Sequence, residues 1–236
     1  MKLITTSWDD GHEADFRIAK LLDKYQLKGT FYIPKANAEH AVMSPSQIRV
    51  LSKQFEIGGH TLNHTRLRHV DESILDKEIG GSFHWLTDVI GTAPTSFCFP
   101  GGDYNNKAVK SAYKHGYKFL RTTELLSVYP PHGLGLFPTT IQLYEHSRVT
   151  YTRHLMKRLK WKSLFQWMMM NSTSDLLKLT QSYLDRIETK GGCFHLWGHS
   201  WEIEENGLWK KLEEVFKILS NRPGFTYVEN RHLLQG

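Results

Sequence analysis

The chain has little cysteine and no long apolar run. Of its 236 residues only two are cysteines, Cys98 and Cys193, which is too few for a disulfide framework and favours a reducing compartment. No stretch approaches the 18 or so apolar residues of a membrane-spanning helix. The first ten residues, MKLITTSWDD, hold too few apolar residues for the core of a signal peptide. These absences together predict a cytoplasmic protein without a transmembrane segment.

Several common functional signatures are also missing. The sequence contains no glycine-rich P-loop and no G-x-S-x-G elbow, which argues against a kinase and against a serine hydrolase. It contains no RNP, KH or zinc-knuckle signature, so we expect no nucleic-acid partner. The formal net charge of +6 permits an anionic partner but does not require one. The 13 histidines are informative only where their spacing suits a metal or proton transfer.

Strand-like and helix-like segments alternate along most of the chain, which predicts an α/β protein with a parallel sheet. We expect one domain over residues 1–236 with an irregular insertion at 124–172, and no internal repeat. The seven expected strands are 2–8, 30–33, 55–59, 95–99, 117–121, 193–197 and 225–228. The expected helices are 13–25, one starting at 44–47, 71–86, 106–115, 174–189 and 208–220.

Two polar clusters follow expected strands, where parallel α/β folds place their sites. Asp9 and Asp10 end the first strand, and adjacent side chains there can diverge, so that one binds a metal while the other acts as a base. A plain surface turn is the alternative. His60 and His64 have the i, i+4 spacing that puts two imidazoles on one face of a helical turn. With Asp10 they would form a two-histidine, one-carboxylate metal site.

A third cluster lies near the end of a late strand. In an extended conformation His195, Trp197 and His199 share one face. One of the two histidines could act as a general acid, because an unperturbed imidazole titrates near neutrality. The alternative for each is a buried histidine bonded to the backbone.

Taken in order, these motifs resemble the polysaccharide deacetylase family, also known as the chitooligosaccharide deacetylase homology domain. The resemblance covers most of the chain and is weakest at 124–172. The family's third motif, Arg-x-Pro-x-Gly, is matched only in part, and its fourth motif is not recognisable. The matching segments are Ser7–Gly11, Lys28–Ile33, His60–His64, Cys98–Gly102, Asp103–Asn105, Gly116–Tyr117, and Leu196 with His199 or His195.

This resemblance implies a distorted (β/α) barrel and a metal-dependent hydrolase that removes an acyl group from an amide. By position, Asp10, His60 and His64 would hold a divalent ion, commonly Zn²⁺, with Co²⁺, Mn²⁺ or Ni²⁺ as alternatives. Asp9 would be the general base. The C-terminal acid would be His199, which follows the strand end, with His195 as the alternative. The residues expected around the oxyanion and the substrate are Gly101, through its backbone N–H, Pro100, Tyr104, Arg121, Trp197 and Trp201.

Two departures from the family pattern bear on that mechanism. Cys98 stands where the family has the arginine that orients the catalytic aspartate, and Arg121, at the end of the next strand, is a candidate replacement. Because the fourth motif is missing, Glu202 is a candidate to orient the acid. Asp175 and Asp185 lie in a later helix and are poor candidates to orient the acid.

We expect the substrate to be an N-acetylated amino sugar in a glycan precursor. The alternatives are a deformylase, a cyclic amide or ureide hydrolase, and a catalytically inactive sugar-binding module. The basic, aromatic stretch 153–162 is expected to be a solvated helix face, with a rim for an acidic or phosphorylated sugar as the alternative. The sequence leaves the oligomeric state open.

Overall fold

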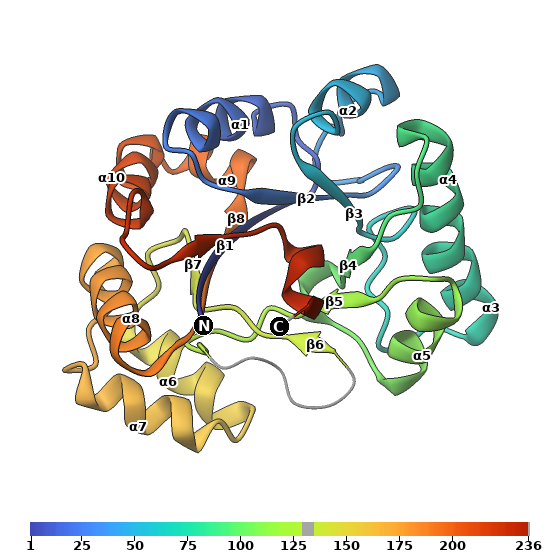
Figure 1. Ribbon diagram of the computed structural model, residues 1–236. Coiled ribbons are helices and arrows are strands. Elements are labelled where there is room, and N and C mark those ends of the chain that lie inside the picture. The colour runs from blue at the N-terminus through green and yellow to red at the C-terminus, as the bar shows by residue number, and fades with distance from the viewer. Residues whose placement is uncertain (129–134, 236) are drawn as a thin grey trace.

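The computed structural model describes residues 1–128 and 135–235, and these build a single sheet of nine strands (Figure 1). Neighbouring strands are parallel throughout, in the order β6-β5-β4-β3-β2-β1-β8-β7, with β9 also paired to β1. The strands are β1 (Lys2–Asp9), β2 (Gly29–Ile33), β3 (Glu56–Gly59), β4 (Ser96–Cys98), β5 (Phe119–Arg121), β6 (Leu136–Phe137), β7 (Ile141–Gln142), β8 (Gly192–His199) and β9 (Thr226–Tyr227).

The α/β class and the distorted barrel are confirmed, but the expected seven strands become nine in the described residues. The two extra strands, β6 and β7, fall in the segment expected to be irregular. Each is two residues long, too short to show a hydrophobic period. The segment after β5 is hydrogen-bonded to the link between β6 and β7, because Leu126 N donates to Thr140 O at 2.9 Å and Ser127 N to Thr139 O at 3.1 Å.

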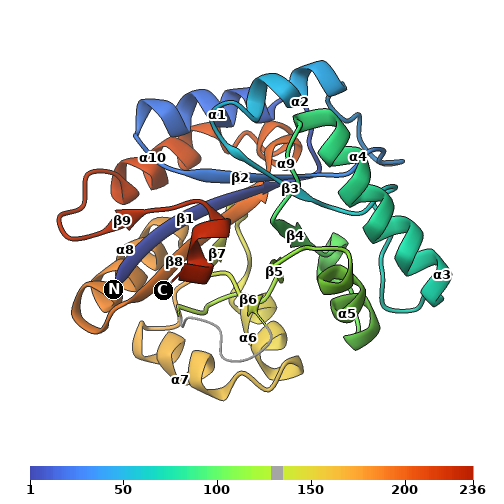
Figure 2. The ribbon, with the colours of Figure 1, turned by 45° about the vertical axis from the view of Figure 1, so that its right-hand side comes forward.

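Helices cover the outside of the curved sheet (Figures 1 and 2). Their bounds are α1 (Asp15–Lys24), α2 (Pro45–Leu51), α3 (Glu72–Leu75), α4 (Gly81–Ile90), α5 (Asn106–Lys114), α6 (Arg148–Lys157), α7 (Trp161–Met169), α8 (Leu176–Lys190), α9 (Ser200–Glu205) and α10 (Trp209–Leu219). A π-helical turn, Asp76–Gly80, joins α3 to α4, so the helix expected at 71–86 extends to Ile90. The 3₁₀ turns are Pro100–Gly102 and Asn230–Gln235.

The middle of the chain is more regular than expected, since α6 and α7 form there. The short helix α9 was not expected either. Residues 129–134 of the segment expected to be irregular lie outside the described residues. Asp175 caps α8, and Asp185 lies on its exposed side, consistent with their poor suitability for the site.

Strand β1 lies in the interior of the sheet, between β2 and β8, and is buried along nearly its whole length. Trp8, near its end, is fully buried and packs edge-on against Phe216 of α10. On its two sides β1 pairs with β2 and β8, with Asp9 opposite Tyr32 and His199. Because the carboxyl ends of parallel strands meet at one end of the barrel, this register gathers the polar clusters into one place.

No helix of the described residues combines the length and the apolar composition needed to cross a membrane.

Candidate active site

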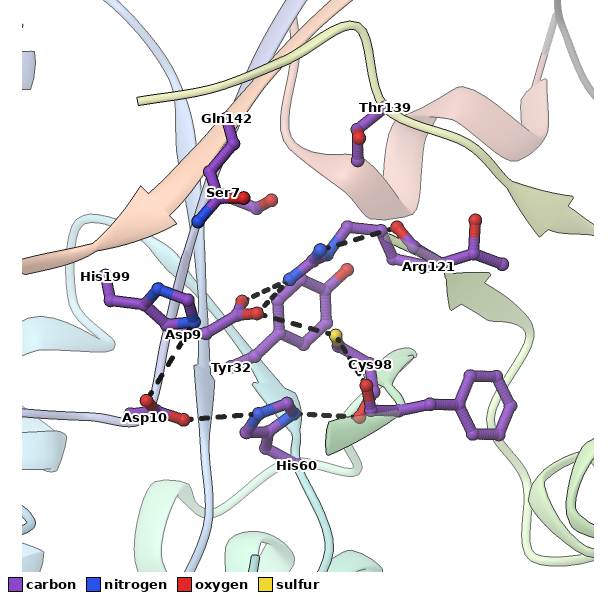
Figure 3. Close-up of polar contacts among 12 residues, drawn as sticks. Ser7, Asp9, Asp10, Tyr32, His60, Cys98, Arg121, Thr139, Gln142 and His199 are labelled. Atoms are coloured by element: carbon purple, nitrogen blue, oxygen red, sulfur yellow. Dashed lines mark hydrogen bonds and ion pairs between the residues drawn. The ribbon is translucent and has the colours of Figure 1, made fainter. Parts of the chain in front are cut away.

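The adjacent aspartates at the end of β1 point to different partners (Figure 3). Asp9 is the last strand residue, and Asp10 follows with a left-handed backbone (φ 78°), which turns its side chain away from that of Asp9. Both are about 2% exposed. Asp9 contacts Arg121, and Asp10 faces His60 and His64. The divergence expected from the sequence is therefore present, and the surface-turn alternative is wrong.

Asp10 Oδ1 is the point on which two imidazoles converge. It lies 3.4 Å from Nε2 of His60 and 3.0 Å from Nε2 of His64. The helical turn expected for the two histidines is wrong, because His60 follows β3 in an irregular loop. Left-handed backbones at Thr61 (φ 63°) and His64 (φ 55°) turn the second ring back toward the first, and the ring centroids are 5.1 Å apart.

This cluster suits a divalent metal. His60 Nδ1 lies 2.8 Å from the carbonyl oxygen of Cys98, so that nitrogen carries the hydrogen and Nε2 offers its lone pair toward Asp10. Asp10 Oδ1 is buried without a hydrogen-bond donor in the described structure. One ligand atom each from Asp10, His60 and His64 lie within 4.8 Å of one another. A buried carboxylate oxygen facing two imidazole nitrogens is a donor set that zinc prefers.

A second cluster of possible ligands, Asp9, His60 and Cys98, shares one histidine with the first. It is less suitable, because complete burial raises the pKa of the Cys98 thiol well above its usual value and keeps it protonated. Asp9 is in addition occupied by Arg121.

The other oxygen of Asp10 is held by Trp201. The indole N–H of Trp201 donates to Asp10 Oδ2 at 2.8 Å. His40 stacks on the same ring, with centroids 4.0 Å apart and planes 19° apart. Trp201 thus orients Asp10, and His40 covers one face of its ring. No motif or spacing pointed to His40, which lies in a loop.

Arg121 supplies to Asp9 the guanidinium that Cys98 lacks. It is fully buried, and its guanidinium contacts both carboxylate oxygens of Asp9. Cys98 and Arg121 are direct neighbours on β4 and β5, and the thiol lies 3.7 Å from Asp9 Oδ2. An arginine one strand away therefore reaches the same aspartate from the neighbouring register position. Coulombic attraction to Asp9 outweighs the desolvation of Arg121 and keeps its pKa above the usual value.

The Arg121 guanidinium lies between two aromatic rings. Its carbon is 4.7 Å from the centroid of Trp197 and 5.3 Å from that of Tyr32. Such cation–π contacts stabilise a buried cation. Trp197 is 5% exposed and is committed to this contact, so it does not present a face for stacking on a sugar.

The two histidines of β8 lie at different positions along the strand. His199, at the strand end, has Nε2 4.0 Å from Asp10 Oδ2 and Nδ1 3.2 Å from Glu202 Oε2. Although burial alone would lower the pKa of His199, the bond to Glu202 and the charges of Asp10 and Asp9 outweigh it and raise the pKa. Glu202, a candidate on weak grounds, thus contacts the ring as expected of an orienting group.

His195 lies deeper in the barrel, four residues before His199 on β8. It pairs with Thr5 rather than with Asp9, and its Nε2 is 2.8 Å from the Ser7 hydroxyl. Burial lowers its pKa well below the usual value, so it stays neutral. Four residues of strand put it roughly 13 Å along the chain from His199. The geometry separates His195 from the aspartates and assigns it to the interior of the barrel.

The polar network behind His199 reaches farther than the sequence indicated. Gln142 Nε2, at the end of β7, donates to Glu202 Oε2 at 3.1 Å. His146 Nε2 lies 3.0 Å from Gln142 Oε1. Because β7 was not expected, Gln142 was not predicted as a residue of the site.

The rim after β4 carries the remaining expected residues. Pro100 starts a 3₁₀ turn in which Gly101 is exposed and has a left-handed backbone (φ 60°). The ring of Tyr104 is half-buried and stacks on Phe99, with centroids 4.4 Å apart. Gly101 can therefore present its backbone to the opening, while Tyr104 is partly committed to packing.

The chain is similar in sequence to several deacetylases. It is 27% identical over 126 residues to YxkH of Bacillus subtilis, a protein assigned to the polysaccharide deacetylases, with 52% of this chain and 45% of that protein covered. It is 28% identical over 123 residues to the peptidoglycan-N-acetylglucosamine deacetylase of Bacillus cereus, with 50% and 54% covered. The chain thus spans about half the length of these curated relatives.

The fold is shared with solved structures over nearly the whole chain. A Mycobacterium smegmatis protein assigned to the polysaccharide deacetylases has a TM-score of 0.67 at 15% identity, covering 99% of this chain and 90% of its own. A family 4 acetyl xylan esterase from Clostridium thermocellum, solved with a cobalt ion, has a TM-score of 0.61 at 15% identity, covering 99% and 91%.

The model of the polysaccharide deacetylase family matches residues 1–120, which carry Asp9, Asp10, His60, His64 and the turn at Gly101. This chain belongs to the polysaccharide deacetylase family.

Proposed function

We propose that the protein is a metal-dependent deacetylase that hydrolyses the N-acetyl group of an amino sugar. The observation that carries the proposal is the convergence of His60 and His64 on Asp10, with the Asp9–Arg121 pair beside it. An inactive binding module would not need to bury two adjacent carboxylates and hold each by a separate set of partners.

The metal ligands we propose are Asp10, His60 and His64. A divalent ion at this position, for which Zn²⁺ is our first choice, would supply Lewis acidity toward the acyl oxygen and toward water. Trp201 holds the second oxygen of Asp10, which leaves Oδ1 directed at the histidines.

Asp9 is the proposed general base. Arg121 fixes the orientation of its carboxylate, so the base is positioned before substrate binds. In this role Asp9 takes the proton of the attacking water as the water oxygen bonds to the acyl carbon. The backbone N–H of Gly101 is the proposed donor to the oxyanion that develops on the acyl oxygen.

His199 is the proposed general acid. Glu202 accepts from Nδ1–H, which directs Nε2 to the same side of the site as Asp10. The raised pKa of His199 keeps the imidazolium available near neutral pH, so that Nε2 can protonate the leaving amine. Cleavage of the C–N bond then yields acetate and the free amino sugar.

The substrate class we propose is an N-acetylated hexosamine within a glycan precursor, either a soluble oligosaccharide or a lipid-linked glycan, with the reaction in the cytoplasm. The support for a glycan is family membership together with the resemblance to the B. cereus peptidoglycan-N-acetylglucosamine deacetylase.

Product analysis tests the proposal. The purified chain, loaded with Zn²⁺ or Co²⁺, is incubated with a panel of N-acetylhexosamine oligosaccharides, and acetate, formate and primary amine are quantified. We expect acetate and amine in equal amounts, abolished by a chelator and by His64→Gln, and unchanged in His69→Gln, a matched variant at an exposed loop position. Formate or ring-opened product would identify a related hydrolase instead, and no product from a metal-loaded chain would contradict the proposal.

A further inference from the structure

The exposed apolar side chains of this protein gather on two neighbouring helices. Ten large hydrophobic residues of the described structure are exposed, and seven of them lie between 149 and 169. They are Val149 (57% exposed), Met156 (51%), Leu159 (70%), Trp161 (59%), Phe165 (67%), Met168 (58%) and Met169 (73%). We call these residues, together with the exposed cations of α6 and α7, the α6–α7 patch.

The outer face of α7 is apolar by its own helical spacing. Trp161, Phe165, Met168 and Met169 stand at i, i+4, i+7 and i+8, the spacing of one helix face. Trp167, on the opposite face, is 2% exposed and packs into the core. Figure 2 shows α7 at the lower edge of the molecule, outside α6 and remote from the sheet. A helix that turns large apolar side chains outward lacks its partner surface.

The charge on these two helices has one sign. Residues 148–170 contain six Lys and Arg and no Asp or Glu, while the whole chain has 30 basic and 24 acidic residues. This segment therefore holds the entire formal excess of +6, and the rest of the chain is balanced. Arg158 and Lys160 pair with Glu124, at 3.5 and 2.7 Å. The four remaining cations are exposed, and they are Arg148, Arg153, Lys157 and Lys162.

We propose that the α6–α7 patch docks the protein onto an anionic phospholipid surface. Aromatic and methionine side chains flanked by lysine and arginine, without acidic residues, match the two layers of such a surface: acyl chains beneath, phosphates above. The nine residues of α7 are too few to cross a bilayer, so the helix lies in the interface with Trp161 and Phe165 inserted. A protein partner of ordinary composition would meet four exposed cations, Arg148, Arg153, Lys157 and Lys162, with no acidic residue on either helix.

The α6–α7 patch is also connected to the candidate active site. The turn between α6 and α7 is anchored to Glu124, three residues beyond Arg121, the partner of Asp9. His154 of α6 accepts a hydrogen bond from the backbone N–H of Leu125 at 3.1 Å. The docking helices are therefore fixed to the segment that leaves the site. The inference does not depend on deacetylase chemistry.

Vesicle co-sedimentation tests the proposal without any substrate. The full chain is mixed with vesicles of phosphatidylcholine alone, or of phosphatidylcholine and phosphatidylglycerol in equal parts. We expect sedimentation only with the anionic vesicles, reduced by salt, and a blue shift of tryptophan emission that is lost in Trp161→Phe.

Two pairs of variants separate the patch from general charge and apolar effects. Lys157→Glu with Lys162→Glu should weaken partitioning by at least about tenfold, since each basic side chain near an anionic surface contributes about a factor of five. Lys20→Glu with Lys53→Glu makes the same change in net charge at exposed positions elsewhere and should leave partitioning within about twofold of wild type. Phe165→Ser with Met169→Ser should also weaken it by about tenfold, whereas Val50→Ser with Ile74→Ser should not.

Failure to sediment with anionic vesicles would overturn the proposal, as would equal binding by wild type and patch variants. Sedimentation velocity without lipid gives a further arm. A dimer that Phe165→Ser with Met169→Ser dissociates, together with no vesicle binding, would show that a second copy of the chain covers the patch instead.

Discussion

Replacing Arg121 with methionine is expected to lower the free energy of unfolding by about 3–5 kcal/mol, because it leaves Asp9 as a buried charge without its cation. Arg121 is fully buried, and the Asp9 side chain is 3% exposed. The orphaned carboxylate therefore gains little solvation from water in the folded protein. Methionine keeps most of the apolar stem, so the loss reports the charge pair rather than a cavity.

The double variant Asp9→Asn with Arg121→Met makes the reasoning refutable. Removing both charges should cost less than the sum of the two single variants by at least about 1 kcal/mol, because neither charge is left unpaired. Urea denaturation followed by circular dichroism measures all four proteins. The exposed pair Lys107–Glu72, with side chains 68% and 73% exposed, is the control and should show coupling below about 1 kcal/mol.

Additive single-variant effects at Asp9 and Arg121 would refute the buried ion pair. Introducing Cys98→Arg into Arg121→Met returns a guanidinium to the neighbouring strand position, which is directly opposite in the β4–β5 register. We expect this variant to recover part of the lost activity, whereas Cys98→Met in the same background should not recover it.

Three further predictions concern the groups around the site. Trp201→Phe removes the donor to Asp10 Oδ2 and should weaken metal affinity about 10–100-fold, measured by competition with a chelating dye. Glu202→Gln removes the carboxylate that raises the pKa of His199, so the alkaline limb of kcat against pH should move to lower pH while KM changes little. Burial lowers the pKa of His154 from 6.5 to about 4, so as the pH falls this histidine is protonated in the unfolded chain before it is protonated in the folded protein. Stability should thus fall by about 1–2 kcal/mol as pH drops from 6.5 to 4, and His154→Gln should remove this loss in urea titrations.

The sequence was sufficient to predict the first half of the barrel. Long apolar or alternating runs such as Lys2–Asp9 specify buried strands, and Ser44 with Gln47 forms the capping box that starts α2. The strands β6 and β7 were missed because two residues carry no period, and hydrogen bonds distant in sequence define them.

The site was predicted as a set of residue types but not as a geometry. Spacing placed His60 and His64 on a helical turn, whereas left-handed backbones at Thr61 and His64 bring their rings together in a loop. Trp201 and Trp197 were expected near the oxyanion and the substrate, and their contacts with His40 and Arg121, which come from other elements, were not predicted. Contacts of this kind arise from tertiary packing and leave no local sequence signal.

The domain boundary over residues 1–236 and the roles of the individual site residues stay predictions. The basic stretch at 153–162 was expected to be a solvated helix face. Its helices exist, but their outer side is as apolar as it is basic, because Trp161 and Leu159 point outward with Lys157 and Lys162. The helical pattern alone did not indicate which face of α7 would be buried.

The central claim is that Asp10, His60 and His64 bind one divalent ion. Elemental analysis after dialysis against Zn²⁺, combined with calorimetric titration of the chelated protein, measures this directly. We predict one ion per chain, less than a tenth of that in Asp10→Asn and in His60→Ala at matched folding by circular dichroism, and unchanged occupancy in His69→Ala. Full occupancy in the Asp10→Asn and His60→Ala variants, or no binding by the folded wild type, would contradict the account.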